Sequence, residues 1–75
     1  MIYLDRITHC EYLIAFEIKT IDRYQTRFNT YLAFDTPKFI QKRRSIERMQ
    51  YIHKNKIDKY REEIRQLKSL QRDAA

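Results

Sequence analysis

Asp35-Thr36-Pro37 is the segment that decides the fold of this 75-residue chain. Asp and Thr side chains accept hydrogen bonds from the first free amides of a helix, and Pro is favoured at the first helical position. We therefore expect a helix to begin at Pro37. Beyond it no Gly or Pro interrupts the chain, and large residues recur at helical spacing. They form one stripe: Phe39, Ile46, Met49, His53, Ile57, Tyr60, Ile64 and Leu67. The pattern predicts a helix over residues 37–73.

The residues before this boundary alternate in a way that is typical of strands. If residues 21–23 form a loop, Phe16 lies opposite Phe28 on one face, and Glu17 lies opposite Arg27 on the other. Ile, Thr, Tyr and Phe are also common here, which is strand-like usage. A short first strand over residues 2–7 would pair with the second. The predicted fold class is α+β: a three-stranded antiparallel sheet in residues 1–34, followed by one long C-terminal helix.

A helical interpretation of the same residues stays open as the alternative. It would give an all-α antiparallel helical hairpin with Pro37 at the corner. Its apolar stripe would be Ile7, Cys10, Ile14, Ile18, Ile21, Phe28 and Leu32. Because this arrangement leaves Tyr12, Phe16 and Phe34 on the opposite side, the strand pattern explains more of the large residues. We therefore favour the sheet.

The chain is short enough for a single small domain over residues 1–75 with a thin core. A helix of this length spans about 55 Å at 1.5 Å per residue, which is more than a short sheet can cover. Its C-terminal end is therefore expected to overhang. The overhang offers an apolar stripe through which two copies would form a homodimer. The residues in question are Ile57, Tyr60, Ile64 and Leu67.

Composition argues against several classes of site. The chain has no Gly, so it cannot form a Gly-rich phosphate loop, and Cys10 is its single cysteine. His9, Cys10 and His53 are too few for a zinc site. No residues suggest catalysis, and we expect a non-enzymatic protein without cofactor or metal. The apolar runs are too short to span a membrane, and no leader pattern is present, so a cytoplasmic location is expected.

Charge is distributed very unevenly along the chain. Residues 1–37 hold four basic and five acidic residues, whereas residues 38–75 hold twelve basic and five acidic ones. Residues 38–61 alone hold nine cations against two acids: Lys38, Lys42, Arg43, Arg44, Arg48, Lys54, Lys56, Lys59 and Arg61. Such a series neutralises phosphates or meets an acidic protein surface. The predicted partner is therefore negatively charged.

The order of elements and the segment Tyr31-Leu32-Ala33-Phe34-Asp35-Thr36-Pro37 resemble compact βββα DNA-binding domains of the AP2 and integrase arm-binding kinds. In those domains the last strand runs into a similar cap, and the helix backs the sheet. The resemblance covers about residues 12–52. It implies that the outer sheet face enters the DNA major groove, and that contacts come from Lys19, Arg27, Asn29 and Tyr31.

Together these observations predict a small accessory or regulatory protein. It would bind nucleic acid, with DNA the first expectation, through helix residues 37–61 and the outer sheet face. The alternative is an inhibitor or adaptor that docks the same basic helix on an acidic protein surface.

Overall fold

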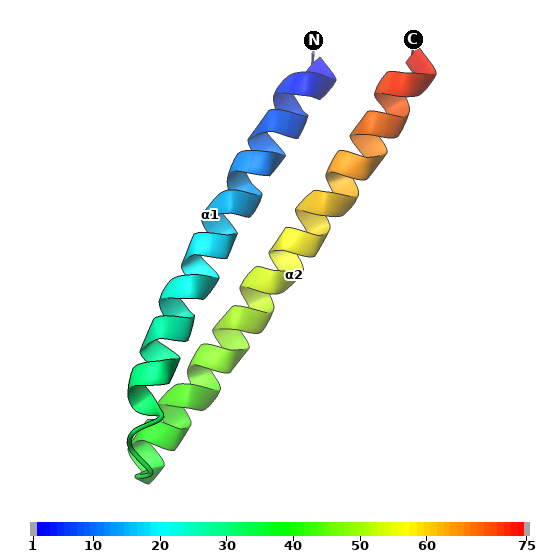
Figure 1. The fold of residues 1–75 in the computed structure, drawn as a ribbon. Helices are drawn as coiled ribbons and strands as arrows, with labels where there is room; N and C mark the ends of the chain where they lie inside the picture. The colour runs from blue at the N-terminus through cyan, green and yellow to red at the C-terminus, as the bar shows by residue number, and fades with distance from the viewer. Residues whose placement is uncertain (1, 75) are drawn as a thin grey trace.

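The computed structural model describes residues 2–74, and these residues form two long helices joined by a short turn. Helix α1 covers Ile2–Tyr31 and helix α2 covers Pro37–Ala74. Figure 1 shows them running antiparallel, with both termini at the same end of a rod of 59 × 14 × 12 Å. The predicted α+β fold is wrong: residues 2–74 contain no strand, and the all-α helical hairpin is the observed architecture.

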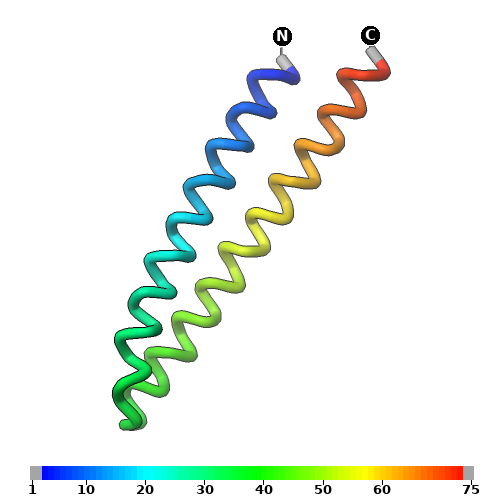
Figure 2. Tube along the Cα trace, viewed as in Figure 1, coloured from blue at the N-terminus to red at the C-terminus, as the bar shows by residue number. Residues whose placement is uncertain are grey.

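The two helices meet along a seam whose positions alternate at spacings of three and four residues. In α1 the buried and half-buried seam residues are Ile7, Cys10, Ile14, Glu17, Ile21, Tyr24, Phe28 and Tyr31. In α2 they are Phe39, Arg43, Ile46, Gln50, His53, Ile57, Tyr60, Ile64 and Leu67. This spacing is the heptad pattern of a coiled coil, in which each side chain packs between residues of the facing helix. The trace in Figure 2 follows the two helices side by side.

Threonines in α1 explain how a strand-like composition folds as a helix. The hydroxyl groups of Thr20, Thr26 and Thr30 donate hydrogen bonds to backbone carbonyls one turn earlier, at 3.0, 3.1 and 3.0 Å. In this way the Thr hydroxyl is satisfied without leaving the helical conformation. The strand-like usage was therefore a weak guide, and packing along the seam decided the structure.

The expected start of the second helix is confirmed at Pro37. The carbonyl oxygen of Thr36 accepts hydrogen bonds from the amides of Phe39 and Ile40, each at 3.0 Å. Thr36 therefore occupies the capping position in front of Pro37, whose missing amide leaves no donor unsatisfied there.

Arg43 closes the turn between the helices. Its Nη1 donates hydrogen bonds of 2.6 Å to the carbonyl oxygens of both Tyr31 and Phe34. The last carbonyls of a helix have no partner inside it and carry partial negative charge. A guanidinium placed there satisfies these acceptors and fixes the path of residues 32–36.

The predicted overhang of the second helix is wrong, because it rested on short strands. Helix α1 runs beside α2 as far as the termini (Figure 1). The residues expected to pair two copies instead occupy seam positions that face α1 of the same chain. Ile57 is buried there, and Tyr60, Ile64 and Leu67 are half-buried.

Candidate anion-binding groove

A groove of about 470 Å³ lies between the two helices near the turn. Helix α1 contributes Arg27 and Tyr31 to its lining, and α2 contributes Lys38, Gln41, Lys42, Ser45 and Ile46. Three of these side chains are cationic, and none of the lining residues is acidic. Arg27 and the two lysines are exposed, so their charges are open to a ligand. The groove is therefore a candidate site for an anion.

The helix pairing brings these cations together from distant parts of the sequence. Arg27 lies one turn before the end of α1, whereas Lys38 and Lys42 lie in the first turns of α2. The turn at residues 32–36 folds the second helix back, so that the two sets line the same groove. Four predicted contact residues, Arg27, Tyr31, Lys38 and Lys42, thus share one surface.

Aromatic rings position one of the cations. The ammonium Nζ of Lys42 lies 5.3 Å from the ring centroid of Tyr31 and 5.2 Å from that of Phe39. An ammonium over a ring face is attracted by the electron density of the ring. The interaction holds the flexible lysine at the edge of the groove, where its remaining N–H groups are available.

The basic surface extends a further turn along α1. A smaller hollow of about 180 Å³ is lined by Thr20, Arg23, Tyr24 and Arg27, and it shares Arg27 with the groove. Arg23 was not among the predicted contact residues. Its spacing of four residues from Arg27 was the available signal, because residues four apart lie on the same side of a helix.

Arg43 is the predicted cation that the structure removes from the binding surface. Its guanidinium is held by the carbonyls of Tyr31 and Phe34 and lies 3.9 Å from a carboxylate oxygen of Asp35. The side chain is 16% exposed. Arg43 therefore stabilises the turn, and its neighbour in sequence, Arg44, faces solvent.

The other predicted cations lie apart from the groove. Arg44 and Arg48 line a separate hollow of α2, together with Glu47, Tyr51 and Ile52. Lys56 and Lys59 line another near the termini, in which Glu62 and Glu63 are also present. Both hollows carry acids, which weakens their field for an anion.

The remaining predicted contact residues are exposed on the helix surfaces and outside the groove lining: Lys19, Asn29, Lys54 and Arg61. The resemblance placed Lys19 and Asn29 on an outer sheet face together with Arg27 and Tyr31. That grouping is wrong because residues 2–31 are helical. Asn29 instead accepts a hydrogen bond of 3.0 Å from Gln25 one turn away.

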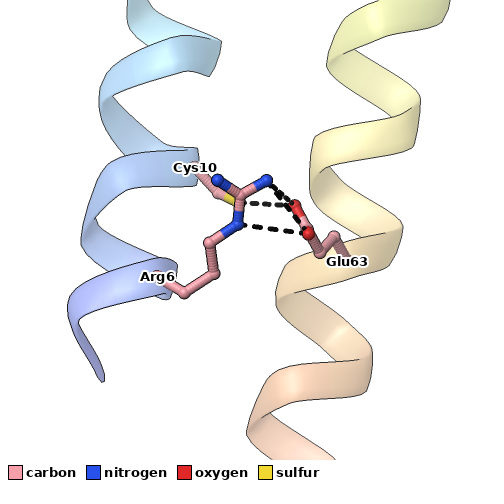
Figure 3. A network of polar contacts seen from close by, with 3 residues as sticks. All are labelled: Arg6, Cys10 and Glu63. Atoms are coloured by element: carbon pink, nitrogen blue, oxygen red, sulfur yellow. Dashed lines mark hydrogen bonds and ion pairs between the residues drawn. The ribbon is translucent and has the colours of Figure 1, made fainter. Parts of the chain in front are cut away.

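A polar network at the terminal end joins the two helices (Figure 3). Arg6 in α1 donates hydrogen bonds from Nε and Nη2 to the carboxylate of Glu63 in α2, the shortest at 2.9 Å. The thiol of Cys10 donates to the same carboxylate at 2.9 Å. These bonds, led by the one from Arg6, lower the pKa of Glu63.

The thiol in this network is poorly suited to nucleophilic chemistry. Burial raises the pKa of Cys10, and the hydrogen bond to Glu63 acts in the same direction. A reactive cysteine needs the opposite shift, because the thiolate is the nucleophile. The network therefore serves to hold the helices together.

No group of three or more His, Cys, Asp or Glu side chains within residues 2–74 is arranged to hold a metal ion. None of the helices in the described part of the chain has the length and apolar character needed to cross a membrane.

Comparison with known protein families, curated proteins and solved structures found no match to this chain.

Proposed function

We propose that this protein is a non-enzymatic nucleic-acid-binding protein, acting in the cytoplasm, whose groove near the helix turn contacts the phosphate backbone. The observation that carries the proposal is the composition of the groove lining. The described residues that line it include three exposed cations and no acidic residue. The uneven charge of the whole chain supports it, since residues 38–75 carry a net charge of +7 and residues 1–37 a net charge of -1.

The groove suits a chain of phosphates better than a single small anion. Its cations stand on two different helices, and Arg23 continues the row beyond Arg27 in the adjoining hollow. An extended anion touches several of these charges at once. Each neutralised phosphate releases condensed counterions, so affinity is expected to fall steeply with salt. DNA is the first expectation for the ligand.

A separate observation favours a second candidate function, docking on an acidic protein surface. The hollow of α2 that holds Arg44 and Arg48 also presents Tyr51 and Ile52, which are 67% and 45% exposed. Exposed aromatic residues next to arginine are frequent in protein interfaces. An adaptor or inhibitor role would use this outer side of α2.

A titration of labelled DNA at two salt concentrations tests the first proposal. We expect binding that weakens by at least about tenfold between about 50 and 200 mM salt. The variant Lys38→Ala/Lys42→Ala should reduce the slope of log affinity against log salt by about 2. The matched control Lys54→Ala/Arg61→Ala removes the same charge from outside the groove.

The outcomes separate the two candidates. A flat salt response, or equal losses in the two double variants, contradicts phosphate binding in the groove. If a stoichiometric protein partner persists after nuclease treatment and is lost in Arg44→Ala/Tyr51→Ala, the docking function is supported instead.

A further inference from the structure

Three aromatic rings form a cluster at the turn end of the hairpin. The ring of Phe39, which is half-buried, contacts the rings of both Tyr31 and Phe34. The ring centroids of Phe34 and Phe39 are 4.6 Å apart, with an angle of 23° between the ring planes. Those of Tyr31 and Phe39 are 5.5 Å apart, at 44°. Phe34 and Phe39 are therefore stacked, and Phe34 is the more exposed of the two.

Phe34 stays partly exposed although its ring stacks on Phe39. One face lies on Phe39, and yet 46% of the residue is exposed. Among the described residues, no second aromatic ring stacks on Phe34. An apolar ring face of this kind can bind a flat partner.

Both backbone polar groups of Phe34 are held by hydrogen bonds. Its amide donates a hydrogen bond to the carbonyl of Tyr31 at 3.2 Å, and its carbonyl accepts one from Arg43 at 2.6 Å. A ring held in this way loses little conformational freedom when a ligand stacks on it.

The aromatic cluster and the basic groove are continuous. Lys42 lines the groove, and its ammonium group lies over the rings of Tyr31 and Phe39. The ring of Phe39 in turn stacks on that of Phe34. A ligand that places phosphates against Lys38 and Lys42 therefore has an aromatic surface at the same end of the molecule. Cations beside an exposed ring are the elements with which proteins bind unpaired nucleotides.

We propose that the turn end of the hairpin prefers single-stranded nucleic acid to duplex, with one base stacked on the exposed ring of Phe34. This inference rests on the proposed function and specifies its ligand. In a duplex the bases stack on one another and offer no open face, whereas an unpaired base brings one. Lys38, Lys42 and Arg27 then contact the phosphates on either side of that base.

Titrations of a single strand and of the duplex of the same sequence test the preference, with Phe34→Ala and Phe34→Leu as variants. We expect tighter binding of the single strand and a loss of about 5- to 100-fold for it in Phe34→Ala, the range of one stacked base. Phe34→Leu keeps an apolar side chain on Phe39 but lacks the ring, and should lose a similar amount. The salt slope should stay unchanged in both variants, because the lysines are intact.

Leu32→Ala is the matched control, because Leu32 is 54% exposed in the same turn and has no ring. It should bind within about twofold of the parent protein. Phe34→Trp gives a direct readout: the chain has no other Trp, so quenching of its fluorescence by a bound single strand reports stacking at this position.

The results distinguish this inference from the function on which it rests. Salt-dependent binding that is equal for single strand and duplex, and unchanged in Phe34→Ala, overturns the stacking site and leaves phosphate binding in place. Absence of salt-dependent binding to either ligand overturns both. Retained helicity of each variant in circular dichroism shows that a loss comes from the missing ring.

Discussion

Arg43 of α2 donates a hydrogen bond of 2.6 Å to the carbonyl oxygen of Tyr31, the last residue of α1. A cation that belongs by sequence to the basic run thus acts as the C-terminal cap of the preceding helix. The same guanidinium also holds the carbonyl of Phe34. This one side chain therefore links α2 to both the end of α1 and the turn that carries Phe34.

Removing Arg43 is expected to destabilise the hairpin. Arg43→Ala leaves two carbonyl oxygens without their charged donor, which should lower the free energy of unfolding by about 1 to 3 kcal/mol. Urea denaturation followed by circular dichroism measures it. Arg44→Ala serves as the control because Arg44 is exposed, and its effect should stay within about 0.5 kcal/mol. Equal effects of the two substitutions would show that the cap contributes nothing.

The middle of the seam holds a polar pair, and the loss of one partner alone should cost more stability than the loss of both. Nδ1 of His53 and Oε2 of Glu17 share a hydrogen bond, and the side chains are only 13% and 7% exposed. His53→Leu leaves the carboxyl group of Glu17 buried without its partner, and should lower the free energy of unfolding by about 3 kcal/mol.

Replacing both residues tests the origin of that effect. In Glu17→Leu/His53→Leu no buried polar group is left unpaired, so stability should recover to the parent level or exceed it. The same urea experiment measures both variants. A double variant less stable than His53→Leu would contradict the argument, because the pair would then contribute more than the seam packing that replaces it.

The same pair explains why the sequence pointed to the wrong fold. Glu17 occupies a seam position of α1, so the apolar stripe of this helix is interrupted where a helical period would be recognised. Tyr12 and Phe16 lie outside the seam, 67% and 52% exposed, and their large side chains suggested a second buried face. Burial of Glu17 depends on His53 in the other helix, a contact that no local pattern contains.

The candidate site was predictable in part. Lys38 and Lys42 stood out by charge, and the Pro37 boundary indicated where their helix begins. Their grouping with Arg27 required the antiparallel pairing, which only the fold supplies. The cap formed by Arg43 was not predictable from charge, because an arginine side chain can donate hydrogen bonds either to the phosphates of a ligand or to backbone carbonyls.

Acid should weaken the hairpin through Glu63. The hydrogen bonds from Arg6, and then from Cys10, place the pKa of Glu63 in the folded protein below its unfolded value of about 4.3. The stabilising contribution is therefore present above about pH 4.3 and is lost as the pH falls through the folded pKa. Thermal unfolding from about pH 6 to about pH 3 should show a fall in midpoint that is smaller in Glu63→Gln.

Glu47→Gln is the control for this pH dependence, since Glu47 is exposed and takes part in no ion pair found among residues 2–74. Its acid profile should follow that of the parent protein. If the profile is unchanged in Glu63→Gln as well, the acid sensitivity belongs to other carboxylates. One of these is Glu62, whose pKa is also lowered, by its hydrogen bond from Arg65.

The thiol of Cys10 should report opening of the helices at their terminal end. Cys10 is 0% exposed, and burial raises the pKa of its thiol. In the folded hairpin a reagent therefore cannot easily reach the sulfur, and little reactive thiolate forms. Alkylation by iodoacetamide at about pH 8 should be at least about tenfold slower than in the urea-unfolded chain. Arg6→Ala should speed it by loosening the link to α2. A folded-state rate equal to the unfolded rate would mean that the ends of the two helices separate freely, and that the Arg6, Cys10 and Glu63 network does not hold them in solution.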